Sequence, residues 1–235
     1  MTARTVLFDL DGTLTDPAHG ITAALRVAMG ACGVEAAAAG PLERFIGPPL
    51  QESFTELGLD AAGVAAAIGA YRGYYTEVGL FENHVYPGVP ELLGRLRSAG
   101  CAVGVATSKP RPLAERIVAH FELDRYLDVE LDGRNRHKHQ VIAVALAALA
   151  ALDAGHDVGG GRSRRAGQPR PAGPMDDRPV MVGDRHHDVT GAIRTGLLPV
   201  GVTWGYGSRQ ELLGAGAAHL VDHPDELDAV LLRPG

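Results

Sequence analysis

The chain has 235 residues, of which 46% are hydrophobic and 21% are charged, and this balance is typical of a soluble globular protein with a substantial core. Its formal net charge of −6 disfavours a nucleic acid polymer or an anionic membrane surface as the main partner. Neither a secretory signal nor a membrane span is recognisable, and Cys32 and Cys101 match no metal or redox spacing. We therefore expect a reduced, cytoplasmic protein.

The first predicted element is a short strand from Val6 to Leu10, which contains Asp9 and leads into Asp11-Gly12-Thr13. Because residues i and i+2 of a strand share a face, Asp9 and Asp11 can converge on one small volume if the extended conformation persists. Gly12 would then let the backbone turn sharply. Two carboxylates so close would repel each other unless a divalent cation lay between them or one held a proton. The alternative is an ordinary turn that ends a strand.

The next region, residues 16 to 83, has the pattern of several Ala-rich helices, punctuated by Gly40-Pro41 and Gly47-Pro48-Pro49. It predicts a helical insert. Pro87-Gly88 marks the return to the main domain, where Pro90 to Ser98 has a helical pattern.

Short apolar runs follow at Ala102 to Ala106, Val180 to Val182 and Leu198 to Val202, with helical stretches between several of them. This alternation predicts an α/β fold with a doubly wound, Rossmann-like parallel sheet. We expect residues 1–15 and 84–235 to form this core. A stretch rich in Gly, Pro and Arg, about 154–179, is expected to be a mobile surface loop, with an RNA contact as a less favoured alternative.

Three further segments carry polar residues close to where open α/β sheets gather their ligands. Thr107-Ser108-Lys109 follows a predicted strand, Lys138 opens the predicted helix from Gln140 to Leu152, and Gly183-Asp184 precedes Asp188. A helix start also suits an anion, because free amides and the helix dipole favour negative charge there. Lys109 and Lys138 are the only two lysines in the chain, beside 20 arginines, which suggests that lysine is kept for chemistry.

Together and in this order, the four segments resemble the haloacid dehalogenase superfamily, and the resemblance covers nearly the whole chain. It implies that Asp9 is the nucleophile and Asp11 the general acid and base. It also implies that Thr107 supplies a phosphate-binding hydroxyl and that Lys138 neutralises charge. Such an enzyme hydrolyses its substrate through an aspartyl-phosphate intermediate.

The resemblance further implies a Mg²⁺ cofactor, held by Asp9, Asp11 through its carbonyl, Asp184 and Asp188. Oxygen ligands suit this hard cation better than His186 and His187, which lie between the late acids. The residues expected to touch the substrate come from several loops: Gly12, Thr107, Ser108, Lys109 and Gly47.

A closer resemblance is to the phosphoglycolate phosphatase-like branch, which has a helical cap after the first motif, and within it to a subgroup of 5′-nucleotidases. Segments typical of that subgroup are Phe45-Ile46-Gly47-Pro48-Pro49-Leu50, Glu82-Asn83, Tyr86-Pro87-Gly88 and Asp132-Gly133. The cap would span residues 16–83, with hinges near Asp16 and Asn83. One departure is that Lys138 lies in Arg136-His137-Lys138-His139, whereas phosphoglycolate phosphatases usually have Gly-Lys-Pro there.

The resemblance therefore implies a magnesium-dependent phosphatase of small phosphorylated metabolites, with phosphoglycolate or nucleoside 5′-monophosphates as substrates. Asp11 argues against a dehalogenase, and the absence of lysine from residues 16–83 argues against a phosphonatase. A sugar phosphomutase and a noncatalytic binding protein on the same fold stay open as less favoured alternatives. The sequence leaves open whether the protein is a monomer or a homodimer.

Overall fold

The computed structural model describes residues 4–46, 49–131, 137–153 and 178–232. Contacts within the chain separate two compact units, one of Met1–Thr15 with Val85–Gly235 and the other of Asp16–His84. Two short strands that pair with each other, β2 (Thr15–Asp16) and β3 (His84–Val85), contain the two points at which the chain passes from one unit to the other.

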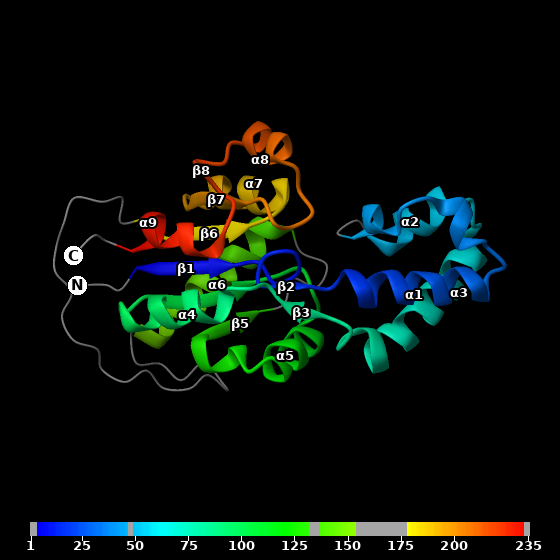
Figure 1. Cartoon of the computed structure of the whole chain (residues 1–235), viewed down its shortest axis with the longest axis horizontal. Helices are drawn as coiled ribbons and strands as arrows, with labels where there is room; N and C mark the ends of the chain where they lie inside the picture. Colours follow the sequence, from blue (N-terminus) through cyan, green and yellow to red (C-terminus); the bar gives the residue numbers. More distant parts are fainter. Residues whose placement is uncertain (1–3, 47–48, 132–136, 154–177, 233–235) are drawn as a thin grey trace. The chain divides into compact units, whose positions relative to one another are not determined.

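The first unit is built on a six-stranded sheet whose strands are all parallel to their neighbours (Figure 1). Its order is β5 (Val129–Leu131), β4 (Ala102–Ala106), β1 (Thr5–Phe8), β6 (Val180–Gly183), β7 (Leu198–Val202) and β8 (His219–Val221). The strand order therefore reverses at β1, which pairs with β4 on one side and β6 on the other. In such sheets ligands bind outside the carboxyl ends of the strands at this point.

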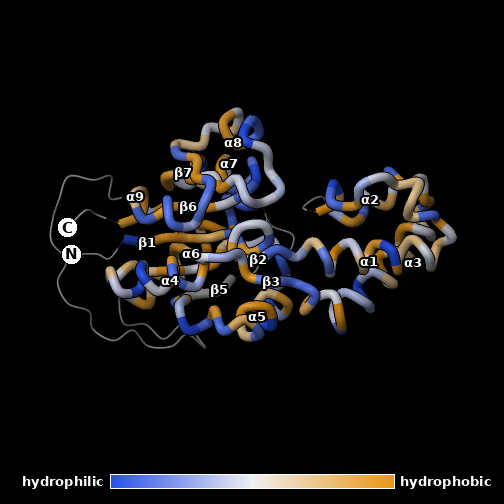
Figure 2. The backbone as a smooth tube through the Cα atoms, in the orientation of Figure 1, coloured by the Kyte–Doolittle hydropathy of each residue, from blue (hydrophilic) through white to orange (hydrophobic). Residues whose placement is uncertain are grey.

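Helices flank the sheet, and hydrophobic residues run along its central strands (Figure 2), of which β4, β6 and β7 are buried throughout. Two of the flanking helices, α6 (Lys138–Asp153) and α7 (His186–Arg194), pack together over a buried cluster that includes Leu7, Met181 and Ile142. The remaining helices of this unit are α4 (Val89–Ser98), α5 (Arg111–His120), α8 (Arg209–Ala215) and α9 (Leu227–Leu231), with short turns at Leu123–Tyr126 and Pro224–Glu226. The predicted doubly wound parallel sheet is confirmed.

The first strand is shorter than the sequence suggests. We predicted a strand from Val6 to Leu10, but β1 ends at Phe8. The reason is the carbonyl of Leu10, which accepts hydrogen bonds from the amides of Thr13, Leu14 and Thr15 and so curls the chain immediately after the sheet. Asp9 still donates its amide to the Val182 carbonyl, whereas Asp11 already belongs to the turn.

The second unit is helical. It contains α1 (Ala18–Ala31), α2 (Leu50–Glu56) and α3 (Ala61–Tyr74), two short 3₁₀ turns (Ala36–Ala39 and Leu42–Phe45) and the π-helical turn η3 (Tyr75–Gly79). Asp60 caps α3 by accepting a hydrogen bond from the amide of Gly63 at 2.8 Å. No helix in the described part of the chain is long and apolar enough to cross a membrane.

Candidate active site

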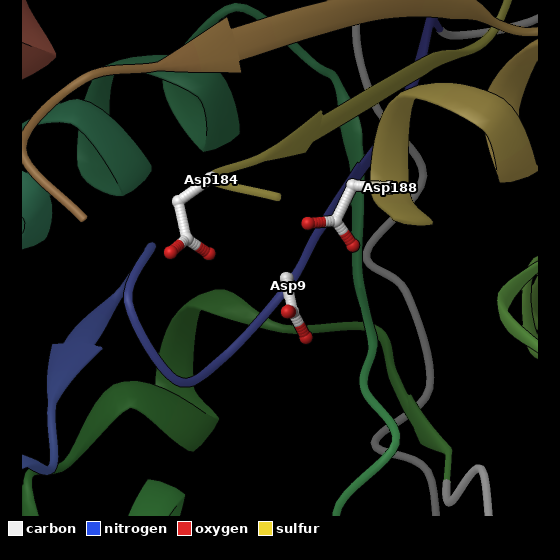
Figure 3. Close-up of side chains that lie close together, drawn as sticks. All are labelled: Asp9, Asp184 and Asp188. Atoms are coloured by element: carbon white, nitrogen blue, oxygen red, sulfur yellow. The ribbon is translucent and has the colours of Figure 1, made fainter. Parts of the chain in front are cut away.

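Three aspartates that are far apart in the sequence meet at the carboxyl edge of the sheet (Figure 3). Asp9 follows β1, Asp184 follows β6, and Asp188 lies in the first turn of α7. Each offers one carboxylate oxygen, and these oxygens all lie within 4.8 Å of one another. Asp184 and Asp188 are 0% and 1% exposed, whereas the side chain of Asp9 is 14% exposed, so solvent reaches the cluster at Asp9. Neighbouring parallel strands thus bring together what the sequence separates.

Lys138, at the start of α6, is the cation of this cluster. Its Nζ lies 2.9 Å from Oδ1 of Asp9 and 2.7 Å from Oδ1 of Asp188, and it donates a hydrogen bond to the Ala106 carbonyl at 3.0 Å. Burial alone would lower the pKa of Lys138, but the two carboxylates raise it above its usual value, so the side chain stays charged.

The charges of the cluster do not balance. Burial, followed by repulsion from Asp188 and Asp9, raises the pKa of Asp184 to about 7. Burial likewise raises the pKa of Asp188 to about 6, although Lys138 opposes this. With all three carboxylates ionised and one lysine beside them, two negative charges remain uncompensated in a buried place. A hard divalent cation with oxygen ligands fits this donor set and this charge.

Two glycines make room for these carboxylates. Gly12 has a φ of +85°, and a Cβ placed on it would lie 2.4 Å from Oδ2 of Asp184. A Cβ on Gly183 would lie 2.2 Å from Cγ of Asp188. Only glycine allows both approaches. The Gly12 amide donates to the Thr15 carbonyl at 2.7 Å, so this amide already has a partner within its own turn.

Asp11 has a different environment from Asp9. Its Oδ2 lies 2.8 Å from Nζ of Lys109, whose side chain is only 7% exposed. Burial raises the pKa of Asp11; Lys109 opposes the rise and Asp9 adds to it. The carboxylate of Asp11 is not part of the cluster formed by Asp9, Asp184 and Asp188. The two aspartates of the first loop are thus held by different lysines.

The other sequence-predicted site residues differ in how closely they join this centre. Thr107 is buried at the end of β4, and its hydroxyl accepts a hydrogen bond from the Lys109 amide at 3.2 Å. Ser108 is exposed. Gly47 lies outside the described residues, as does most of the loop predicted at about 154–179, so both expectations stay predictions.

The loop after β7 holds Asp184 in place, and we did not predict it from the sequence. The Tyr206 amide donates to Oδ2 of Asp184 at 2.8 Å, while the Thr13 hydroxyl donates to Oδ1 at 3.3 Å. Trp204 Nε1 in turn donates to the Thr13 carbonyl at 3.0 Å. A Cβ on Gly205 would lie 2.3 Å from Cβ of Asp184, so the loop presses directly on this residue. The signal was the Trp-Gly-Tyr-Gly run directly after a predicted strand.

Comparison with known proteins agrees with this geometry. The family model described as haloacid dehalogenase-like hydrolase matches residues 6–155, and a second HAD-hydrolase-like model matches residues 142–227. The chain is 39% identical to a 5′-nucleotidase of Pseudomonas aeruginosa, over 88% of this chain and 86% of that protein. It is 36% identical to the tyrosine-protein kinase PtkA of Mycobacterium tuberculosis, over 95% of this chain and 69% of that protein.

A solved structure with the same fold is the crystal structure of a predicted phosphatase from Clostridium acetobutylicum. It has a TM-score of 0.77 and 35% identity, and the match covers 99% of both chains. The resemblance inferred from the four motifs is thus confirmed. Both the sequence matches and the shared fold lead to one conclusion: the chain belongs to the haloacid dehalogenase-like hydrolases.

Proposed function

We propose that this protein is a magnesium-dependent phosphatase that hydrolyses small phosphate monoesters through an aspartyl phosphate on Asp9. The observation that carries the proposal is the cluster of Asp9, Asp184 and Asp188, of which the last two are buried, with Lys138 beside it. These aspartates, together with the carbonyl of Asp11, would hold the ion. A bound Mg²⁺ would supply positive charge to the phosphoryl oxygens and reduce their repulsion from a carboxylate nucleophile.

In the first step a carboxylate oxygen of Asp9 attacks phosphorus while the bond from phosphorus to the ester oxygen breaks. Lys138 orients Asp9, because its Nζ lies 2.9 Å from Oδ1. The leaving oxygen takes a proton from Asp11. A carboxyl that donates a proton must first hold one, and the raised pKa of Asp11 supports this role.

In the second step water hydrolyses the aspartyl phosphate. Asp11, now a carboxylate, takes a proton from the water as its oxygen bonds to phosphorus and the bond to Asp9 breaks. This returns Asp9 as a carboxylate, Asp11 in its protonated form and inorganic phosphate as the product. Lys138 and the Thr107 hydroxyl are our candidates for stabilising the charge that the phosphoryl oxygens carry in both transition states.

The substrate is a small phosphorylated metabolite, and two candidates stand out. The branch resemblance suggests phosphoglycolate, whereas the 39% identical relative is named a 5′-nucleotidase, which favours a nucleoside 5′-monophosphate. We propose that residues 16–83 act as a cap that selects between such substrates and that residues 1–15 and 84–235 carry the chemistry. The departure from Gly-Lys-Pro around Lys138 weakens the resemblance that favours phosphoglycolate.

A second candidate function is phosphoryl transfer to tyrosine. The name of the 36% identical relative, which matches 95% of this chain, favours it. The same aspartyl phosphate would serve, with a phenol oxygen in place of water as the group that accepts the phosphoryl group. The two functions thus differ in the phosphoryl donor of the first step, which for the transferase is ATP with ADP as the leaving group, and in the acceptor of the second step.

The experiment that tests the proposal measures phosphate release from nucleoside 5′-monophosphates, phosphoglycolate, sugar phosphates and phosphotyrosine, with Mg²⁺ and with chelator. We expect release only with Mg²⁺, and its loss in Asp9→Asn but not in the matched control Asp124→Asn, which changes an exposed aspartate. Release that persists in Asp9→Asn would contradict the aspartyl-phosphate mechanism. An isomerised sugar phosphate without free phosphate would indicate a mutase, and labelling of a tyrosine-containing polypeptide from ATP would indicate the transferase.

A further inference from the structure

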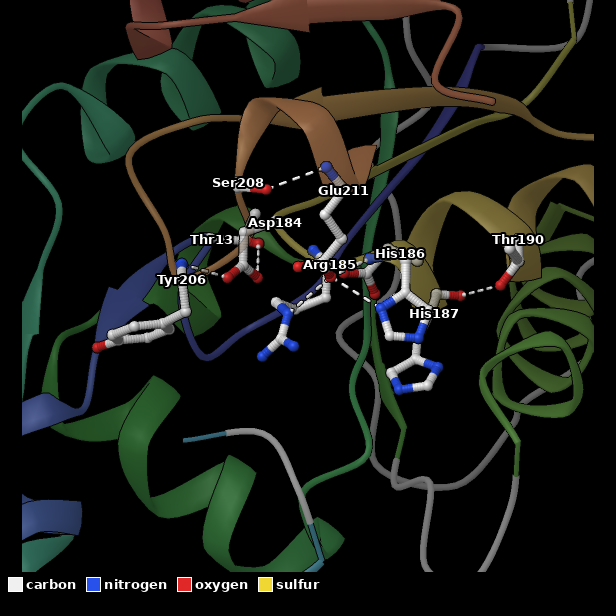
Figure 4. A network of polar contacts seen from close by, with 10 residues as sticks. Thr13, Asp184, Arg185, His186, His187, Thr190, Tyr206, Ser208 and Glu211 are labelled. Atoms are coloured by element: carbon white, nitrogen blue, oxygen red, sulfur yellow. Dashed lines mark hydrogen bonds and ion pairs between the residues drawn. The ribbon is translucent and has the colours of Figure 1, made fainter. Parts of the chain in front are cut away.

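Glu211, on α8, contacts the turn that joins Asp184 to Asp188, two of the three aspartates of the acidic cluster (Figure 4). Its Oε1 lies 2.9 Å from the His186 amide, 2.8 Å from Nδ1 of the same histidine and 3.0 Å from Nε of Arg185. Since a carboxylate only accepts hydrogen bonds, all three nitrogens donate to this one oxygen. No motif used to recognise the family includes Glu211.

Glu211 is itself held by several hydrogen bonds and is kept in its charged form. The hydroxyl of Ser208 caps α8 by accepting a hydrogen bond from the Glu211 amide at 3.0 Å. Burial opposes ionisation, but the hydrogen bonds from His186 and Arg185 lower the pKa of Glu211 to about 2. Charge-assisted hydrogen bonds of this kind are stronger than neutral ones. Glu211 is therefore a fixed anchor beside the turn.

The same turn is held by the aspartates on its other side. Oδ2 of Asp188 accepts the Arg185 amide at 3.0 Å, and Asp184 is held by the Tyr206 amide. Arg185 and His186 therefore lie between Glu211 and the carboxylates that face Asp9. If Glu211 were lost, the turn would lose the three hydrogen bonds that converge on Oε1 from the side of α8.

We propose that Glu211 is a positioning residue for the metal site: by fixing the Arg185–His186 turn it aims Asp184 and Asp188 at the cation. This inference rests on the proposed function, because it deepens the role of the same acidic cluster. Partners that orient metal ligands commonly contribute 10- to 100-fold to metal affinity. Glu211 bonds to Arg185 and His186 and not to a metal ligand itself. We therefore expect its loss to weaken metal binding by about tenfold, the lower end of this range.

The test measures Mn²⁺ binding to the full-length protein by electron paramagnetic resonance, without substrate, so that activity plays no part. We expect the Kd for Mn²⁺ to rise about tenfold in Glu211→Ala, and by less in Glu211→Gln, which still accepts hydrogen bonds. The matched control is Glu115→Gln, which changes an exposed glutamate on α5 that pairs with Arg111 in its own helix. Circular dichroism establishes that each variant is folded.

A double-mutant cycle separates positioning from general destabilisation. His186→Ala removes the ring that contacts Glu211, so its effect on the Kd should not add to that of Glu211→Ala. Folded Glu211 variants with a lower Tm and an unchanged Kd would overturn the inference. If Asp184→Asn abolishes Mn²⁺ binding in that case, the proposed metal site still stands. Absence of Mn²⁺ binding in the wild type would overturn both.

Discussion

We call the edge of the core sheet where Asp9, Asp184 and Asp188 lie the acidic edge. Both this edge and the helical unit contain glycines at which another part of the chain lies too close for a Cβ atom to fit. At the acidic edge the close partners of Gly12 and Gly183 are carboxylate side chains: a Cβ on Gly12 would meet Asp184, and one on Gly183 would meet Asp188. In the helical unit it is backbone, since a Cβ on Gly20 would lie 1.8 Å from the Gly79 carbonyl oxygen.

The two units also differ in what they bury. The described part of the core buries Lys138, Asp184 and Asp188 at one edge, whereas the buried polar side chains of the described helical unit are the hydroxyl groups of Thr22 and Ser53. Burying charge is costly unless the charge is paired or binds a metal. The difference indicates that the core is packed to hold charge and the helical unit to hold helices together.

Among the changes that test this difference between the two units, Asp11→Asn in the core should have the largest effect on activity. The amide cannot donate a carboxylic proton, so kcat/KM should fall about 10³-fold for alkyl phosphates. This ratio reports the steps up to loss of the leaving group, and not the later hydrolysis in which Asp11 acts as the base. It should fall much less for p-nitrophenyl phosphate, whose leaving group needs little protonation. Equal losses on both substrates would mean that Asp11 is not the acid. The check is steady-state kinetics on the two substrate types.

A smaller loss is expected for Lys138→Met, which removes the cation between Asp9 and Asp188. Because a buried charge would lose its partner, the free energy of unfolding of the metal-free protein should fall by about 3 kcal/mol. Phosphate release should fall about 10²-fold with Mg²⁺ present. Urea denaturation with chelator and with Mg²⁺ measures the first effect. If stability in chelator were unchanged, the folded protein would not depend on the ion pairs that Lys138 forms with Asp9 and Asp188.

The pH dependence of stability offers a further test. Folding raises the pKa of Asp184 to about 7 and that of Asp188 to about 6. At pH values between the ordinary pKa of an aspartate and these raised values, the folded metal-free protein therefore binds more protons than the unfolded chain. The contribution of these two carboxyl groups to stability should therefore be greatest at low pH and be lost as the pH rises through 6 to 7. Mg²⁺ should reverse this trend, because it binds the ionised carboxylates. Melting curves from pH 5 to 8, with chelator and with Mg²⁺, give the result; parallel curves would contradict it.

The smallest effect at the acidic edge is expected from a change in the helical unit. Gly20→Ala should lower stability by about 2 kcal/mol, because the added methyl meets the Gly79 carbonyl, and should leave the Kd for Mn²⁺ unchanged. Gly12→Ala is the matched variant and should weaken Mn²⁺ binding, because its methyl would meet Asp184. If both variants weakened binding equally, the division of roles between the two units would be wrong. Calorimetry and metal titration on both variants decide.

Much of the core could be predicted because its strands are continuous apolar runs. Ala102–Ala106 and Leu198–Val202 have the predicted bounds for this reason. The four motifs could be recognised because order and spacing survive in the sequence. The end of β1 could not be predicted, since it depends on three amides that converge on one carbonyl, that of Leu10.

The supporting residues of the site were not predictable for a different reason. Glu211 and Tyr206 reach Asp184 and its neighbours only because β7 lies beside β6, and this placement brings the following loop and α8 to the same edge. The partner of Lys109 was equally hidden, because its contact with Asp11 joins loops after two different strands. A local pattern such as Trp-Gly-Tyr-Gly can mark a loop of interest, but it does not show which residue that loop contacts.

The burial of both lysines has a consequence for the chemistry of the protein surface. The chain has only two lysines, and their side chains are 6% and 7% exposed, inside the candidate active site. Reagents that acylate amines should therefore find no accessible lysine while the protein is folded. Acylation of Lys138 or Lys109, read by mass spectrometry, would then report directly how often the site opens.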